Sequence, residues 1–126
     1  MPNPGADVIV DFDFEDGLLF VGVENLGSEP ALEVRVEFSP PFRCLGGETP
    51  IGSLPLFRGI SFLAPRKKIR TLVDSSGAYF ARGEPVRVKA AVTWAGRDGA
   101  QRKASMEHNL EIYRSLAYVP GRKKED

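Results

Sequence analysis

A regular alternation of apolar and polar residues at positions 32–39 constrains the fold of this chain more than any other feature. The even positions carry the apolar groups Leu32, Val34, Val36 and Phe38. A period of two gathers these groups on one face of a β-strand, whereas a helix would scatter them round its axis. Ser28 and Pro30 could begin a helix as N-cap and first-turn residue, but the alternation after them favours a strand. Residues 25–30 are therefore predicted to connect two strands, with Gly27 at positive φ and Pro30 ending the turn.

Similar patterns along the chain predict an all-β fold. Residues 8–14, 86–94 and 104–112 alternate in the same way, and the apolar run at 18–23 indicates a strand inside a sheet. Two shorter strands are predicted within 56–65 and 67–75, joined by a turn near Pro65, and 77–85 is predicted as a loop. About seven antiparallel strands with frequent turn signals are typical of an immunoglobulin-like β-sandwich of two sheets.

The length of 126 residues fits a single domain spanning residues 1–126, with its core in 7–113 and a polar tail at 114–126. The formal net charge is zero, so we expect no nucleic-acid partner. No apolar run approaches the roughly 20 residues of a membrane span, and residues 1–8 lack the pattern of a signal peptide. We expect a soluble chain of undetermined compartment, either cytoplasmic or a soluble domain of a membrane-attached protein. The single Cys44 excludes an internal disulfide.

Charge is unevenly distributed along the chain. Residues 1–40 hold nine acidic residues and one basic residue, Arg35, and the remainder carries the opposite excess. One interpretation is a basic patch for an acidic partner, formed by Arg66, Lys67, Lys68 and Arg70. We favour the other, in which early and late strands are neighbours whose charges pair across a sheet. It predicts that three residues of one strand face two of another: Glu33, Arg35 and Glu37 opposite Arg87 and Lys89.

The segments "VENLGSEPALEVRVEF", "FLAPRKKIRTLVD" and "VRVKAAVTW" together resemble the bacterial immunoglobulin-like domains of the cell-adhesion-related (CARDB) type. The resemblance covers residues 7–113. It rests on an asparagine and a glycine between two early strands, a proline-marked turn before a middle strand, and a final hairpin. It implies a seven-strand sandwich without a catalytic site, usually one module of a larger envelope or membrane-attached protein. Arg66 departs from the pattern, because such domains tend to have glycine after the proline of that turn.

Catalytic and metal sites are disfavoured by counting, because the chain has one cysteine and one histidine. Cys44 lies in a loop rich in glycine and proline, and His108 falls on the apolar face of the last strand, where we expect a buried neutral histidine. Two carboxylate pairs with strand spacing, Asp11 with Asp13 and Glu33 with Glu37, are expected to be solvated surface groups. We expect no cofactor, no metal and no enzymatic activity.

The remaining functions are binding functions. The preferred hypothesis is a non-catalytic protein-interaction or structural module whose partner is another protein, or a second copy pairing through an edge strand. The alternative is a carbohydrate or small-ligand binding module, which needs several aromatic rings exposed together. Its candidate rings are Tyr79, Phe80, Tyr113 and Tyr118. Trp94 is expected in the core with its indole N–H bonded to a backbone carbonyl at the strand end.

The connection from Phe42 to Gly59 is long for a small sandwich and rich in apolar residues. The favoured interpretation is that it covers an open end of the core. The alternative is a surface patch that a partner protein covers. Its residues are Phe42, Arg43, Ile51, Leu54, Phe57 and Arg58.

Overall fold

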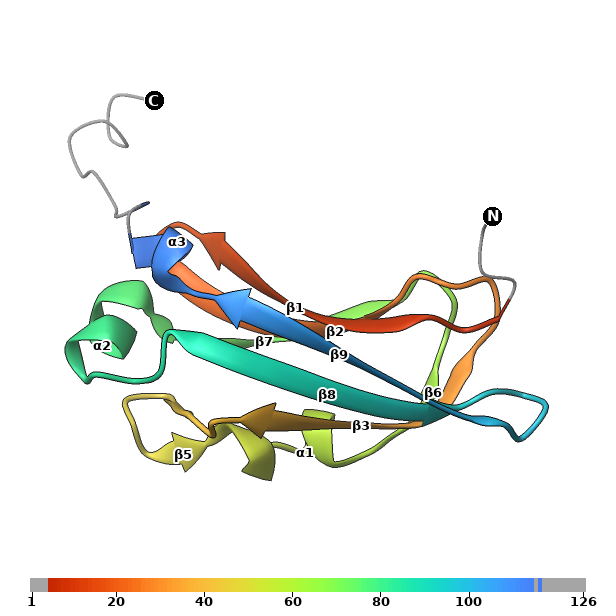
Figure 1. Ribbon diagram of the computed structural model, residues 1–126. Coiled ribbons are helices and arrows are strands. Elements are labelled where there is room, and N and C mark those ends of the chain that lie inside the picture. Colours follow the sequence, from red (N-terminus) through yellow and green to blue (C-terminus); the bar gives the residue numbers. More distant parts are fainter. Residues whose placement is uncertain (1–4, 115, 117–126) are drawn as a thin grey trace.

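The computed structural model describes residues 5–114 and 116, and it shows two antiparallel β-sheets packed face to face (Figure 1). The three-stranded sheet has the order β1 (Val8–Glu15), β2 (Leu18–Asn25) and β7 (Lys68–Ser75). The four-stranded sheet has the order β6 (Ile60–Leu63), β3 (Ala31–Ser39), β8 (Arg87–Ala95) and β9 (Gln101–Asn109). The predicted β-sandwich of seven strands in two sheets is confirmed. A separate two-stranded ribbon pairs β4 (Arg43–Cys44) with β5 (Thr49–Pro50).

Short helices fill the connections. They are the 3₁₀ turn η1 (Ile51–Ser53), α1 (Pro55–Arg58), α2 (Ser76–Ala81) and α3 (Glu111–Arg114). The loop predicted at 77–85 is wrong in its first half, because the Ser75 hydroxyl accepts a hydrogen bond from the Ala78 amide and so caps α2. The last strand also ends before the predicted boundary, and Ile112 is 55% exposed on α3. No helix among the described residues is long and apolar enough to cross a membrane.

The core lies between the two sheets and follows the predicted strand faces. In β8 the inward residues are Val88, Ala90, Val92 and Trp94, all of them buried as predicted. In β1, Val8, Val10 and Phe12 face them from the other sheet. The Trp94 indole N–H is buried without a hydrogen-bond partner among the described residues, so its predicted bond to a strand-end carbonyl is wrong.

A β-bulge in β3 changes the predicted face of one residue. Leu32 lies opposite Ala95 but Arg35 lies opposite Thr93, so β3 has one more residue than β8 in this interval. The extra residue is accommodated at Glu33, whose φ of 51° is in the left-handed region. The bulge shifts the alternation by one position. Ala31 is therefore buried in place of Leu32, and Leu32 pairs with the exposed Phe62 of β6.

Asn25 joins three segments at one end of the sandwich and is the only polar side chain that is fully buried among the described residues. Its Oδ1 atom accepts hydrogen bonds from the amides of Asp7 and Gly27, and its Nδ2 atom donates to the carbonyls of Glu29 and Leu63. Gly27 does not take the predicted positive φ. It is required for space, because a Cβ atom there would lie 2.0 Å from the carbonyl oxygen of Gly5.

Candidate interaction surface

The segment from Phe42 to Gly59 lies against the core. Phe42, Ile51 and Phe57 are each at most 2% exposed, and the rings of Phe42 and Phe57 pack edge-on against Phe38 at centroid distances of 5.2 and 5.0 Å. This burial agrees with the favoured interpretation, in which the segment covers an end of the core. Of the six residues of the alternative patch, only Arg43, Leu54 and Arg58 keep surface exposure. Buried rings offer no area to a partner, so the patch cannot form as it was drawn from the sequence.

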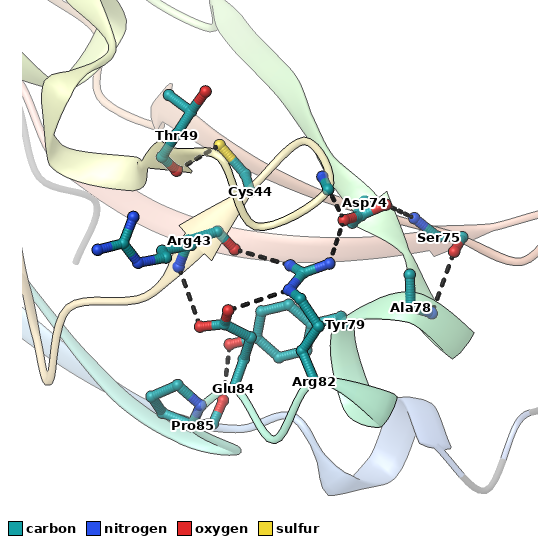
Figure 2. Close-up of polar contacts among 11 residues, drawn as sticks. Arg43, Cys44, Thr49, Asp74, Ser75, Ala78, Tyr79, Arg82, Glu84 and Pro85 are labelled. Atoms are coloured by element: carbon teal, nitrogen blue, oxygen red, sulfur yellow. Dashed lines mark hydrogen bonds and ion pairs between the residues drawn. The ribbon is translucent and has the colours of Figure 1, made fainter.

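Arg82 ties this segment to the three-stranded sheet (Figure 2). Its guanidinium contacts the Asp74 carboxylate at 2.7 Å and the Glu84 carboxylate at 3.1 Å. The same two carboxylates hold the backbone of the segment, since Glu84 accepts from the Arg43 amide and Asp74 accepts from the Gly46 amide. All three charged groups are mostly buried and paired with one another. The Arg82 network is therefore a structural clamp whose hydrogen-bonding groups are already in use.

Cys44 lies beside the Arg82 network and is fully buried. Its thiol donates to the carbonyl oxygen of Thr49 at 3.4 Å (Figure 2). Burial raises the pKa of Cys44, and the nearby Asp74 carboxylate raises it further. A buried thiol with a raised pKa is a poor nucleophile, so the structure gives Cys44 a packing role.

His108 has an environment separate from that of Cys44. Its side chain is 18% exposed, so it is half-buried where full burial was expected. The Nε2 atom lies 2.9 Å from the carbonyl oxygen of Val10, and the ring packs edge-on against Phe12. No group of three or more histidine, cysteine, aspartate or glutamate residues in the described part of the chain is arranged to hold a metal ion.

The outer face of the three-stranded sheet neutralises its own charges. Lys68 of β7 contacts Asp13 of β1 at 2.7 Å, and Arg70 of β7 contacts Glu15 of β1 at 2.9 Å. These pairs reach across the central strand β2, where Gly22 has no side chain to block them. Early acidic and later basic charges do pair across this sheet as interpreted, but β1 and β7 are not neighbours, because β2 lies between them. Two members of the alternative basic patch, Lys68 and Arg70, are therefore already paired.

The outer face of the four-stranded sheet is different. The predicted neighbours β3 and β8 do pair, but Glu37 lies opposite Ala91 and Arg35 lies opposite Thr93, so neither faces Lys89 or Arg87 directly. The predicted facing pairs are wrong, because the observed register places Ser39 opposite Lys89. No ion pair within 4 Å forms among these side chains in the described residues.

Two shallow depressions of about 400 Å³ each lie side by side on this face. The small side chains of Ala91 and Ser105 are directly opposite each other and form the floor of one depression, between Lys89, Lys103 and Thr93. Lys89 also borders the second, together with Glu107. We define the β3–β8–β9 face as the two depressions and the outward-facing residues around them. These residues are Arg35 and Glu37 of β3, Lys89, Ala91 and Thr93 of β8, and Lys103, Ser105 and Glu107 of β9. The sequence predicted that the charges of this face pair with one another, so it did not indicate a binding surface here.

The rings expected for a carbohydrate site do not gather on one surface. Tyr79 is fully buried and donates its hydroxyl hydrogen to the carbonyl of Pro85, as Figure 2 shows. Tyr113 donates to the carbonyl of Phe12, and the ring of Phe80 is covered by the guanidinium of Arg114 at 4.7 Å. The fourth candidate, Tyr118, lies outside the described residues.

The sequence matches one protein-family model. The family model described as a domain of unknown function (DUF8453) matches residues 3–114, which include every strand of the sandwich. The chain belongs to the DUF8453 family. No match is found among curated proteins or solved structures. Family membership therefore assigns no activity to this DUF8453 domain.

Proposed function

We propose that this DUF8453 domain is a non-catalytic protein-interaction module that binds its partner through the β3–β8–β9 face. The observation that carries the proposal is the contrast between the two outer faces. Asp13, Glu15, Lys68 and Arg70 neutralise one another on the three-stranded sheet. The β3–β8–β9 face leaves charges of both signs without an ionic partner in the described residues.

The physical argument concerns solvation and specificity. Unpaired charges beside small residues keep a surface soluble when it is free, and they select a partner of complementary charge when it is bound. The depressions floored by Ala91 and Ser105 can accept side chains of that partner. A flat sheet face of this kind suits another protein better than a small molecule, which needs a deeper cavity that surrounds it.

The strand order supports an immunoglobulin-like assignment within this proposal. One sheet combines the first, second and fifth of the seven main strands, and the other combines the third, sixth and seventh, as in immunoglobulin-like sandwiches. The fourth strand, β6, departs from the constant-type order, because it pairs with the third strand and not with the sheet of the first two. Such folds use their faces, edges and loops for recognition. A role as a CARDB-like module of a larger bacterial protein belongs to the same proposal. No observation favours the carbohydrate-binding alternative.

Site-specific photo-crosslinking in cells tests the proposal. A photoreactive residue placed at Thr93, which is exposed on the β3–β8–β9 face, should give a protein adduct of defined mass. The matched control is the same residue at Glu24, on the outer face of the three-stranded sheet. Equal adduct yields at both positions, or none at Thr93, would contradict the proposal.

A further inference from the structure

The strand β9 is the edge of the four-stranded sheet, and among the described residues no strand pairs with its outer side. The amide of Leu110 donates to the carbonyl of Val86, so the even-numbered residues of β9 form the hydrogen-bonded pairs with β8. The backbone groups of the odd-numbered residues therefore point away from the sheet. No strand pairs with them in the described part of the chain, and the register with β8 runs from Gln101 to Asn109 without a bulge.

The edge of β1 on the same side of the sandwich is closed by side chains. The Val10 amide donates to the Met106 sulfur at 3.4 Å, and the Val10 carbonyl contacts His108 Nε2 at 2.9 Å. The Phe12 carbonyl accepts from the Tyr113 hydroxyl at 2.9 Å, and the Phe12 amide donates to an Asp11 carboxylate oxygen at 2.9 Å. The central groups of this edge are satisfied, and a second strand could pair here only by displacing them.

The two remaining edges are shorter or partly covered. On β7, the Val73 carbonyl accepts from the Leu45 amide, and the Asp74 side chain accepts from the Gly46 amide, so the loop after β4 covers the C-terminal end of this edge. The edge strand β6 has only four residues, from Ile60 to Leu63. Shortening and covering are the usual ways in which proteins protect sheet edges. The nine-residue β9 has neither protection among the described residues.

The sequence of β9 is complementary to itself when two copies run antiparallel in full overlap. In that register Ser105 lies opposite Ser105 of the second copy on the two-fold axis. Lys103 then lies opposite Glu107 on both sides of the axis, and Gln101 lies opposite Asn109. These odd-numbered residues are the ones whose backbone groups point outward, so the same register satisfies about ten hydrogen bonds. A shift by four residues in one direction would place Lys103 opposite itself, and the same shift in the other direction would place Glu107 opposite itself.

We propose that β9 pairs antiparallel with β9 of a second copy of this chain, joining the two four-stranded sheets into one continuous sheet. The inference goes beyond the proposed interaction function, because it uses the edge of the four-stranded sheet and leaves the β3–β8–β9 face free for another protein. The backbone groups supply the attraction, and the two Lys103–Glu107 pairs select the register. The closed β1 edge, the partly covered β7 edge and the four-residue β6 leave β9 as the longest uncovered edge among the described residues.

Charge reversal with mixing tests the pairing in the full chain. Sedimentation should show a monomer–dimer equilibrium for the wild type. Lys103→Glu and Glu107→Lys should each weaken the dimer about tenfold, because each places like charges opposite one another at two positions. An equimolar mixture of the two variants should dimerise at least as tightly as wild type, since opposite charges meet again at both positions. Arg58→Glu, a reversal at an exposed position of α1 away from β9 and from the β3–β8–β9 face, should leave the equilibrium unchanged.

Amide hydrogen exchange gives a second readout that does not depend on the charge variants. The amides of Lys103, Ser105 and Glu107 should become protected as the protein concentration rises, while those of β6 should not change. A chain that stays monomeric at high concentration, or a dimer that both charge variants leave intact, would overturn the pairing. A monomeric wild type that still forms Thr93 adducts overturns only this inference, whereas a β9 dimer without adducts at Thr93 would refute the proposed binding face.

Discussion

Gly22 lies against Arg70 on the outer face of the three-stranded sheet, where a Cβ atom at position 22 would come within 2.9 Å of the Cβ atom of Arg70. The two residues are direct partners in the β2–β7 register. The missing side chain lets Arg70 lie over the ring of Phe20 at 3.9 Å and reach Glu15 on the far strand. One glycine in a central strand thus permits the charge pairing of the whole face.

Gly22→Ala should therefore destabilise the domain by about 1–3 kcal/mol, because the new methyl group forces Arg70 and its backbone to shift. Urea unfolding measures the change. Gly52→Ala is the matched control, since a Cβ atom there meets nothing within 4 Å. The control should be neutral or stabilising by up to about 1 kcal/mol. Equal effects of the two substitutions would contradict the role assigned to Gly22.

Arg66→Gly should stabilise the domain by up to about 1 kcal/mol. Arg66 has a φ of 65° in the turn closed by the hydrogen bond from the Lys67 amide to the Ala64 carbonyl, and only glycine adopts this conformation without strain. The side chain is exposed, so little packing is lost. Lys67→Gly, at the neighbouring position without a positive φ, should destabilise instead. Thermal melts of both variants give the comparison, and a lower melting temperature for Arg66→Gly would refute the strain.

Asp74 should contribute stability that depends on pH. Burial raises the pKa of Asp74, but the hydrogen bonds from Arg82 and from the amides of Gly46 and Ser75 outweigh burial and hold the pKa below its usual value. Because the folded-state pKa is the lower one, the contribution is complete above about pH 4 and is lost as the pH falls through the folded-state pKa. Asp74→Asn should therefore flatten the acid limb of a stability profile measured between about pH 5 and pH 2. An unchanged acid limb would exclude this contribution.

Phe57→Ser should lower stability by about 3–5 kcal/mol, because it removes a buried ring from its contact with Phe38 and places a hydroxyl in the core. The matched control is Phe62→Ser, because the Phe62 side chain is 60% exposed. It should change stability by less than about 0.5 kcal/mol. A Phe57 variant that melts like wild type while its self-association or solubility changes would restore the patch interpretation of residues 42–59.

The sequence by itself determined the strands and the class of fold. Except for Leu32 in β3, the alternation in β1, β3 and β8 specifies which residues face the core, because successive side chains of a regular strand point to opposite faces. The continuous apolar run of β2 correctly indicated an interior strand. All these features are local, so they can be read from neighbouring residues.

Only the tertiary structure decided which charges pair, which residues are bulged and which edges are open. In the register between β3 and β8, Glu33 is the extra residue of a β-bulge, and this bulge moves Leu32 out of the core. The closure of the β1 edge by His108 joins residues almost a hundred positions apart. Lys68 reaches Asp13 across the central strand β2, because Gly22 has no side chain between them. These contacts depend on the register and packing of distant segments, and no local period in the sequence encodes such distances.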